Sequence, residues 1–168
     1  ARFSKGVTPK NNAVALLAET FGPSIYNKEY RKAFFEKLGV KVPDGKGQYF
    51  VSMSNLAKQG RNKNEARLFI SQLFKEHDTG SERLWSRDEL PKLTTGLDAN
   101  EKSLIKVLQA AEREKWYCPI IVTDDEFGGI LLAALMPLQQ ETRSLARALT
   151  CRALLAVKEG RIEDAQKD

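Results

Sequence analysis

The longest helical pattern in the chain is LQQETRSLARALTCRALLAVKE, which spans residues 138–159. Its apolar side chains recur at steps of three, four or seven residues, the spacing of a buried helix face. They are Leu138, Leu145, Ala148, Leu149, Ala153 and Ala156. Charged residues occupy the opposite face, and the alanines favour helix and a close neighbour. We therefore expect this helix to be the spine of the fold, packed against at least one other helix.

The end of this helix is marked by Gly160, which suits the left-handed position where a side chain would be strained. Helical patterning resumes at once in residues 161–165. This arrangement, over about residues 144–168, resembles the hairpin of a tetratricopeptide repeat, with Gly160 at the turn. Arg152 and Ala156 stand where that repeat usually has a large apolar and an aromatic residue, so the resemblance implies a single repeat-like hairpin. The rest of the chain resembles uncharacterised bacterial helical proteins, which implies no activity.

Further helices follow from the same periodicity. We expect them at residues 12–20, 27–38, 66–77 and 98–114, with an apolar turn or two at 130–136 that Pro137 ends or kinks. The helix at 66–77 is predicted to bury one apolar side and to close at Asp78–Gly80. That side consists of Ala66, Phe69, Ile70, Leu73, Phe74 and His77. Asp98 to Glu101 has the spacing of a capping box and is predicted to open the helix at 98–114.

These patterns predict an all-α fold, a compact multi-helix domain with a C-terminal repeat-like hairpin. Only residues 49–51 and 120–123 have the composition of strands, too little for a sheet. A length of 168 residues with 42% hydrophobic content is ordinary for one globular domain, residues 1–168. A division into a basic half, 1–80, and a helical half, 81–168, stays open.

Charge is distributed unevenly along the chain. Residues 1–75 contain 14 Lys and Arg against 5 Asp and Glu, whereas residues 76–168 contain 13 against 17. A basic half of this kind favours an anionic partner such as nucleic acid or an acidic membrane surface. It is equally consistent with a contact to the acidic half of the same chain.

The candidate anion-binding residues lie in this basic region. They are Lys28, Arg31, Lys32, Lys58, Arg61 and Lys63. No helix-turn-helix, zinc finger or RNA-binding motif accompanies them, so solvated helix faces explain them as well.

No catalytic or cofactor signature is present. The cluster Asp124-Asp125-Glu126 is the candidate metal site, but adjacent carboxylates seldom converge on one ion, and acids at a helix N-terminus explain the cluster too. The lone His77 follows the apolar period, and neither serine nor cysteine has a base assigned by the sequence. We therefore predict no cofactor and no metal ligand, and lean away from an enzyme.

The compartment of the protein is not indicated. The chain lacks an apolar run near the roughly 18 residues of a spanning helix, so we expect a soluble protein as given, while an upstream signal or membrane anchor stays possible. Cys118 and Cys151 lie far apart in sequence, and whether they pair stays open.

Two functions from different classes remain. The first is a non-enzymatic helical module for protein–protein interaction or scaffolding, suggested by the repeat-like hairpin and the absence of a catalytic set. The alternative is a binder of anionic polymers, either nucleic acid or an acidic membrane surface, through the basic N-terminal half.

Overall fold

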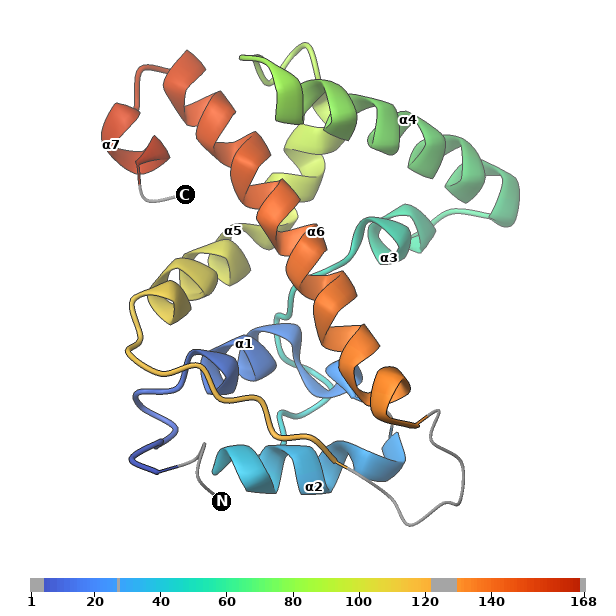
Figure 1. Ribbon diagram of the computed structural model, residues 1–168. Coiled ribbons are helices and arrows are strands. Elements are labelled where there is room, and N and C mark those ends of the chain that lie inside the picture. Colours follow the sequence, from blue (N-terminus) through green and yellow to red (C-terminus); the bar gives the residue numbers. More distant parts are fainter. Residues whose placement is uncertain (1–4, 27, 122–129, 167–168) are drawn as a thin grey trace. The chain divides into compact units, whose positions relative to one another are not determined.

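The computed structural model describes residues 5–26, 28–121 and 130–166, without the side chains of residues 54 and 130–140. This part of the chain is helical, and its one β-type feature is a single bridge between Asn12 and Lys115 (Figure 1). The helices are α1 (Ala13–Phe21), the 3-10 helix η2 (Pro23–Ile25), α2 (Lys28–Leu38), α3 (Met53–Lys58), α4 (Lys63–Glu82), α5 (Pro91–Ala111), α6 (Ile130–Lys158) and α7 (Ile162–Ala165). The prediction of an all-α fold is confirmed.

The chain divides into two units, each made of two separate segments. The first unit comprises residues 1–50 and 102–142, and the second comprises residues 51–101 and 143–168. Helices α5 and α6 contribute residues to both units. The expectation of a single domain stays a prediction.

The first unit has an aromatic core supplied by α1, α2 and the connection between them. Phe34 and Phe35 on α2 are fully buried, and the ring of Tyr26 stacks on Phe34 with 4.3 Å between centroids. Phe21 closes α1, which ends because Gly22 adopts a left-handed φ of 75°. The helices α1 and α2 and the aromatic core of this unit therefore follow from the spacing of apolar residues in the sequence.

The second unit is centred on Trp85. The indole is fully buried, and its Nε1 donates to the carbonyl oxygen of Cys151 on α6 at 3.1 Å. His77 on α4 is also buried, and the Cys151 thiol lies 3.7 Å from its carbonyl oxygen. Burial raises the pKa of the Cys151 thiol to about 12, so this cysteine is a neutral core residue. Both cysteines, Cys118 and Cys151, are free thiols.

Contacts between α4 and α5 explain two errors in the predicted helix limits. Helix α4 continues past Gly80 to Glu82, because Gly80 is buried where a Cβ atom would clash with Leu93 of α5. Helix α5 starts at Pro91 and not at Asp98. Its first free N–H groups, those of Lys92 and Leu93, donate to the Glu76 carboxylate of α4 at 2.7 and 2.9 Å. Glu76 of α4 therefore caps α5, in place of the local capping box that was expected at Asp98 to Glu101.

Helix α6 is continuous over Ile130–Lys158, so Pro137 does not end it. In its described part, the predicted buried face is only partly correct. Leu145, Ala148 and Ala156 are buried, Leu149 and Ala153 are half-buried, and Leu138 lies outside the described side chains. Cys151 and Leu155 are buried in addition. The buried face is therefore rotated slightly from the predicted one.

The turn after α6 forms as predicted. Gly160 has a φ of 76°, its N–H donates to Val157 O at 3.0 Å, and the Arg161 N–H donates to Ala156 O at 2.8 Å. This pair of hydrogen bonds is the Schellman motif. Helix α7 follows over four residues. The resemblance of this hairpin to a tetratricopeptide repeat stays a prediction.

Candidate functional site

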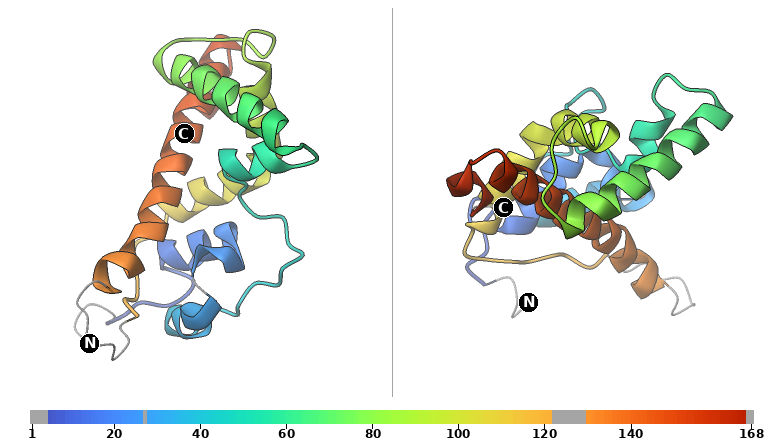
Figure 2. Two further views of the ribbon diagram at one scale, coloured as in Figure 1. Left: turned by 90° about the vertical axis from the view of Figure 1, so that its right-hand side faces the viewer. Right: turned by 90° about the horizontal axis from the view of Figure 1, so that it is seen from above.

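The second unit carries a short helical hairpin in which α3 and the first half of α4 lie side by side (Figure 2). Gly60 makes the turn between them with a φ of 65°. Asn62 then starts α4 with a full capping box. Its Oδ1 accepts from the N–H of Glu65 at 3.0 Å, and the Glu65 carboxylate accepts from the Asn62 N–H at 3.0 Å. The hairpin is therefore specified locally by its own sequence.

Arg61 contacts both helices of this hairpin. Its Nη1 donates to the carbonyl oxygens of Leu56 and Gln59 at the end of α3, both at 3.1 Å. The same guanidinium lies 3.8 Å above the centroid of the Phe69 ring on α4. Arg61 thus joins the two helices and covers an aromatic face that would otherwise be open.

A groove of about 470 Å³ lies between α3 and α4. We call it the α3–α4 groove, and it is lined by Ala57, Lys58, Arg61, Asn62, Lys63, Ala66, Arg67 and Ile70. Its floor is apolar, because Ala57 is buried and Ala66 and Ile70 are half-buried. Its rim is basic.

The rim charges are not neutralised. Lys58, Lys63 and Arg67 are exposed and form no ion pair with any residue that the structure describes. Glu65 is the one carboxylate between residues 53 and 70, and its side chain is turned to the α4 cap. The N-terminus of α4 adds the positive end of a helix dipole. The groove is therefore an apolar depression in a positive field.

The apolar side of α4 extends this depression along the helix. Ala66, Ile70 and Phe74 follow one another at steps of four and share a face. The sequence predicted the whole apolar side of α4 to be buried, but only Leu73 and His77 are, and 44% of the Phe74 surface is exposed. The prediction is wrong for Ala66, Phe69, Ile70 and Phe74, because α3 and Arg61 cover this side of α4 only in part.

The predicted anion-binding residues separate into two groups. Lys58, Arg61 and Lys63 come together at the α3–α4 groove, and Arg67 joins them. Arg67 was missed, although its position four residues after Lys63 places both on one helix face. Lys28, Arg31 and Lys32 lie instead on α2 of the first unit. There Lys32 pairs with Glu36 at 3.8 Å, and Arg31 donates to the Tyr26 carbonyl oxygen at 3.4 Å.

The candidate metal residues Asp124, Asp125 and Glu126 lie outside the described residues. Over the described ranges, no group of three or more potential metal-ligating side chains comes together.

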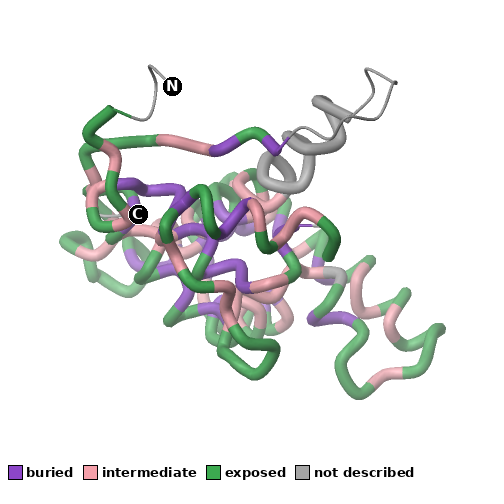
Figure 3. The backbone as a smooth tube through the Cα atoms, turned by 90° about the horizontal axis from the view of Figure 1, so that it is seen from below, coloured by how far each residue is buried: buried purple, intermediate pink, exposed green. Residues whose placement is uncertain are grey.

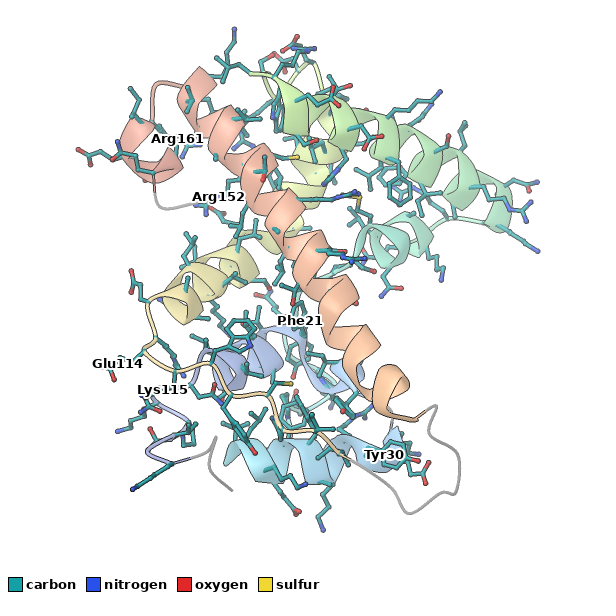
Figure 4. All side chains as sticks on the ribbon, in the orientation of Figure 1. Phe21, Tyr30, Glu114, Lys115, Arg152 and Arg161 are labelled. Carbon is teal, nitrogen blue, oxygen red and sulfur yellow. The ribbon has the colours of Figure 1, made fainter. Side chains whose placement is uncertain are left out.

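A second cavity, of about 180 Å³, lies in the same unit among α5, α6 and the turn after α6. Arg152, Glu159 and Arg161 line it from α6 and the turn after it, where Figure 4 labels the two arginines, and Arg87 and Asp98 line it from α5 and the connection before α5. Glu159 accepts from Arg161 at 2.6 Å and from Arg87 at 2.9 Å, which lowers the pKa of its carboxyl group. Since these charges satisfy one another, the cavity is better explained as a structural ion-pair network that holds the α6 turn.

Comparison with known proteins gives no assignment. The chain matches no protein-family model, no curated protein and no solved structure. Across the described part of the chain, none of the helices combines the length and the apolar character needed to cross a membrane.

Proposed function

We propose that the protein is a non-enzymatic interaction module whose α3–α4 groove binds an acidic amphipathic segment of a partner protein. The observation that carries this proposal is an apolar floor combined with a basic rim that no carboxylate of the described residues neutralises. Lys58, Lys63 and Arg67 would meet acidic side chains of the ligand, while Ile70 and Phe74 would meet its apolar side chains. Complementary charge of this kind sets partner choice and association rate.

The apolar floor favours a protein segment over the other anionic partners. Nucleic acids are held mainly by phosphate contacts to basic side chains and need no apolar depression. Stacking of bases needs open aromatic faces; the Phe69 face is covered by Arg61, which leaves Phe74 as the exposed aromatic side chain on this side of α4. A helix with apolar anchors at every third or fourth residue fits a groove beside α4, in the mode used by many helix-binding domains.

The chemistry of the lining also supports binding. The groove is lined by Ala, Ile, Asn, Lys and Arg side chains, and no His, Asp, Glu, Cys or Tyr side chain is among them. It therefore offers no general acid or base of the usual kind. Arg and exposed aromatic residues, by contrast, are the side chains that most often dominate binding energy at protein interfaces.

A fluorescent peptide of about 16 residues, with leucines on one helical face and glutamates on the other, tests this function by anisotropy. We expect binding to the full chain at about 50 mM salt, and weakening as salt rises. The variant Lys63→Glu/Arg67→Glu is expected to weaken binding about tenfold or more. Lys41→Glu/Lys106→Glu is the control, since it changes net charge equally at exposed residues that do not line the groove.

A second variant distinguishes binding of an amphipathic peptide from binding of a polyanion. Phe74→Ser removes an exposed apolar contact and no charge, so it is expected to weaken peptide binding and leave the salt dependence unchanged. Mixed-sequence DNA and acidic vesicles serve as parallel ligands. If the peptide fails to bind, or if both charge variants weaken it equally, the proposal is wrong. Tighter binding of DNA or vesicles, lost in Lys63→Glu/Arg67→Glu, would instead establish the alternative function of anionic-polymer binding.

A further inference from the structure

An extended segment, residues 115–121, runs across the first unit after α5. Every second residue, Lys115 and then Tyr117, holds it by hydrogen bonds of its main-chain groups to residues 11–13. The Lys115 N–H donates to Asn11 O at 2.9 Å, and the Lys115 carbonyl oxygen accepts from the Ala13 N–H at 2.8 Å. Two residues on, the Tyr117 N–H and carbonyl oxygen both bond to the side-chain amide of Asn12 at 2.9 Å. One edge of the segment is therefore paired in the manner of a strand.

The opposite edge of the segment is unpaired. The main-chain groups of Trp116 and Cys118 form no hydrogen bond with any residue in the described part of the chain. The Lys37 ammonium donates to the carbonyl oxygen of Ile120 at 3.5 Å. Because alternate residues of an extended chain direct their N–H and C=O groups to opposite edges, Trp116, Cys118 and Ile120 share the edge away from Asn12. Among the described residues, only the Ile120 carbonyl oxygen on this edge has a partner.

Side-chain burial alternates at the end of the segment, over residues 119–121, after two exposed and two half-buried residues (Figure 3). Pro119 and Ile121 are buried, whereas 61% of Trp116 and 44% of Ile120 are exposed. Pro119 lacks an N–H group, but its main chain belongs to the anchored edge, so the proline does not interrupt the free one. The segment has the donors, acceptors and apolar side chains of an edge strand that accepts another strand.

We infer that this edge pairs with the same edge of a second copy of the chain, antiparallel and centred on Cys118. This register places Cys118 opposite Cys118 of the second copy and Trp116 opposite Ile120. All three residue pairs are then hydrogen-bonded pairs, which use every free N–H and C=O of Trp116 and Cys118. An aromatic residue opposite a β-branched one is a favourable cross-strand pair.

A second copy fits this edge because the edge is complementary to itself under two-fold symmetry, which is the commonest arrangement of homodimers. Glu114 and Lys115 lie where the chain leaves α5 and enters the segment (Figure 4). In the antiparallel register, Glu114 of one copy approaches the end of the other segment, where Lys37 contacts Ile120. Glu114 of one copy and Lys37 of the other therefore form an oppositely charged pair at each end of the paired segments, beside Lys115. The inference is independent of the α3–α4 groove, which belongs to the other unit.

Cross-linking of the full chain tests the register. Opposed residues of a hydrogen-bonded antiparallel pair have Cα atoms about 5.5 Å apart, within the range that a disulfide spans. With copper phenanthroline as catalyst, oxygen takes two electrons and two protons from the two Cys118 thiols, and one disulfide forms. We expect a covalent dimer on a non-reducing gel, absent in Cys118→Ser.

Light scattering after size exclusion tests the assembly itself. We expect a dimer whose dissociation constant rises at least tenfold in Trp116→Glu, which places a carboxylate at the strand interface. Leu68→Glu is the matched control, since Leu68 is equally exposed, at 62%, but lies on α4. The inference is overturned by a chain that is monomeric at about 100 μM, the concentration where even weak edge pairing is detectable. A dimer that persists in Trp116→Glu, or that yields no Cys118 cross-link, overturns it as well.

Discussion

The side-chain amide of Asn100 forms two hydrogen bonds with the main chain of Val51. Asn100 Oδ1 accepts from the Val51 N–H at 2.7 Å, and Asn100 Nδ2 donates to the Val51 carbonyl oxygen at 3.0 Å. The amide thus pairs with the connection before α3 as a neighbouring strand would. Asn12 makes the same pair of contacts to Tyr117 in the first unit. In this helical protein, two buried asparagines take the place of sheet pairing for extended connections.

Asn100→Asp is therefore expected to destabilise the protein by about 1–3 kcal/mol, the cost of leaving a buried polar group unsatisfied. The variant keeps the shape of the side chain, but a carboxylate oxygen would face the Val51 carbonyl oxygen. Urea unfolding at neutral pH measures the effect. Asn55→Asp, at an exposed position of α3, is the control and should change stability by less than about 0.5 kcal/mol. Equal losses in the two variants would contradict the role assigned to Asn100.

The stability of the protein is expected to fall as pH decreases through the range where the histidine titrates. Burial lowers the pKa of His77, the nearby Arg147 charge lowers it further, and Asp78 opposes these effects. Neither ring nitrogen has a hydrogen-bond partner among the described residues. The unfolded chain therefore binds a proton more readily than the folded one, so stability is complete above pH about 6.5 and is lost as pH falls towards the folded pKa.

Urea midpoints between pH about 6 and 7.5 check this prediction, because carboxylates with ordinary pKa values do not titrate there. His77 is the only histidine in the chain, and the variant His77→Phe tests whether the slope belongs to it. His77→Phe is expected to remove the slope, whatever its effect on the midpoint itself. A slope that persists in His77→Phe would show that another group titrates in this window.

The packed face of α6 gives a third prediction. Ala153 was expected to lie at the helix contact, but it is half-buried, whereas Ala156 is fully buried. Ala156→Leu should therefore overpack the contact and lower the free energy of unfolding by about 1–3 kcal/mol. Ala146→Leu, at an exposed position of the same helix, should change it by less than about 0.5 kcal/mol. Thermal or urea unfolding of both variants measures the difference, and an unchanged Ala156→Leu would show that the face is open.

Local signals in the sequence predicted much of the fold. Helix α1 ends at Gly22 and α2 at Gly39, as expected, because each glycine takes a left-handed φ that other residues avoid. The α1 cap lies one residue later than predicted, at Asn12. Boundaries failed where a distant residue decided them: Glu76 caps α5, and the approach of Leu93 requires Gly80 within α4. Such contacts are set by packing and leave no mark in the local pattern.

The candidate site was predicted less completely, for a similar physical reason. Lys58, Arg61 and Lys63 were identified from charge alone, and the structure places them on one groove. The sequence gives no sign that Ile70 and Phe74 are left uncovered, since their spacing is that of a buried helix face. Whether such a face is covered depends on neighbouring elements. An apolar period therefore predicts a helix more reliably than it predicts burial.

The turn that ends α6 provides the last prediction. Gly160 has a φ of 76°, and a Cβ atom at this position would have no heavy atom within 4 Å. Any loss in Gly160→Ala therefore comes from the left-handed backbone itself and not from a steric clash, and is expected to be about 1–2 kcal/mol. Urea unfolding measures it.

Gly45→Ala is the matched control for this variant. Gly45 is equally open, but its φ lies outside the left-handed region, so alanine should leave stability unchanged or slightly raised. A cost in Gly160→Ala alone would show that the left-handed residue stabilises the turn between α6 and α7. Equal behaviour of the two variants would mean that the ion pairs of Arg161 with Glu159 and Asp164 hold the turn without help from the glycine.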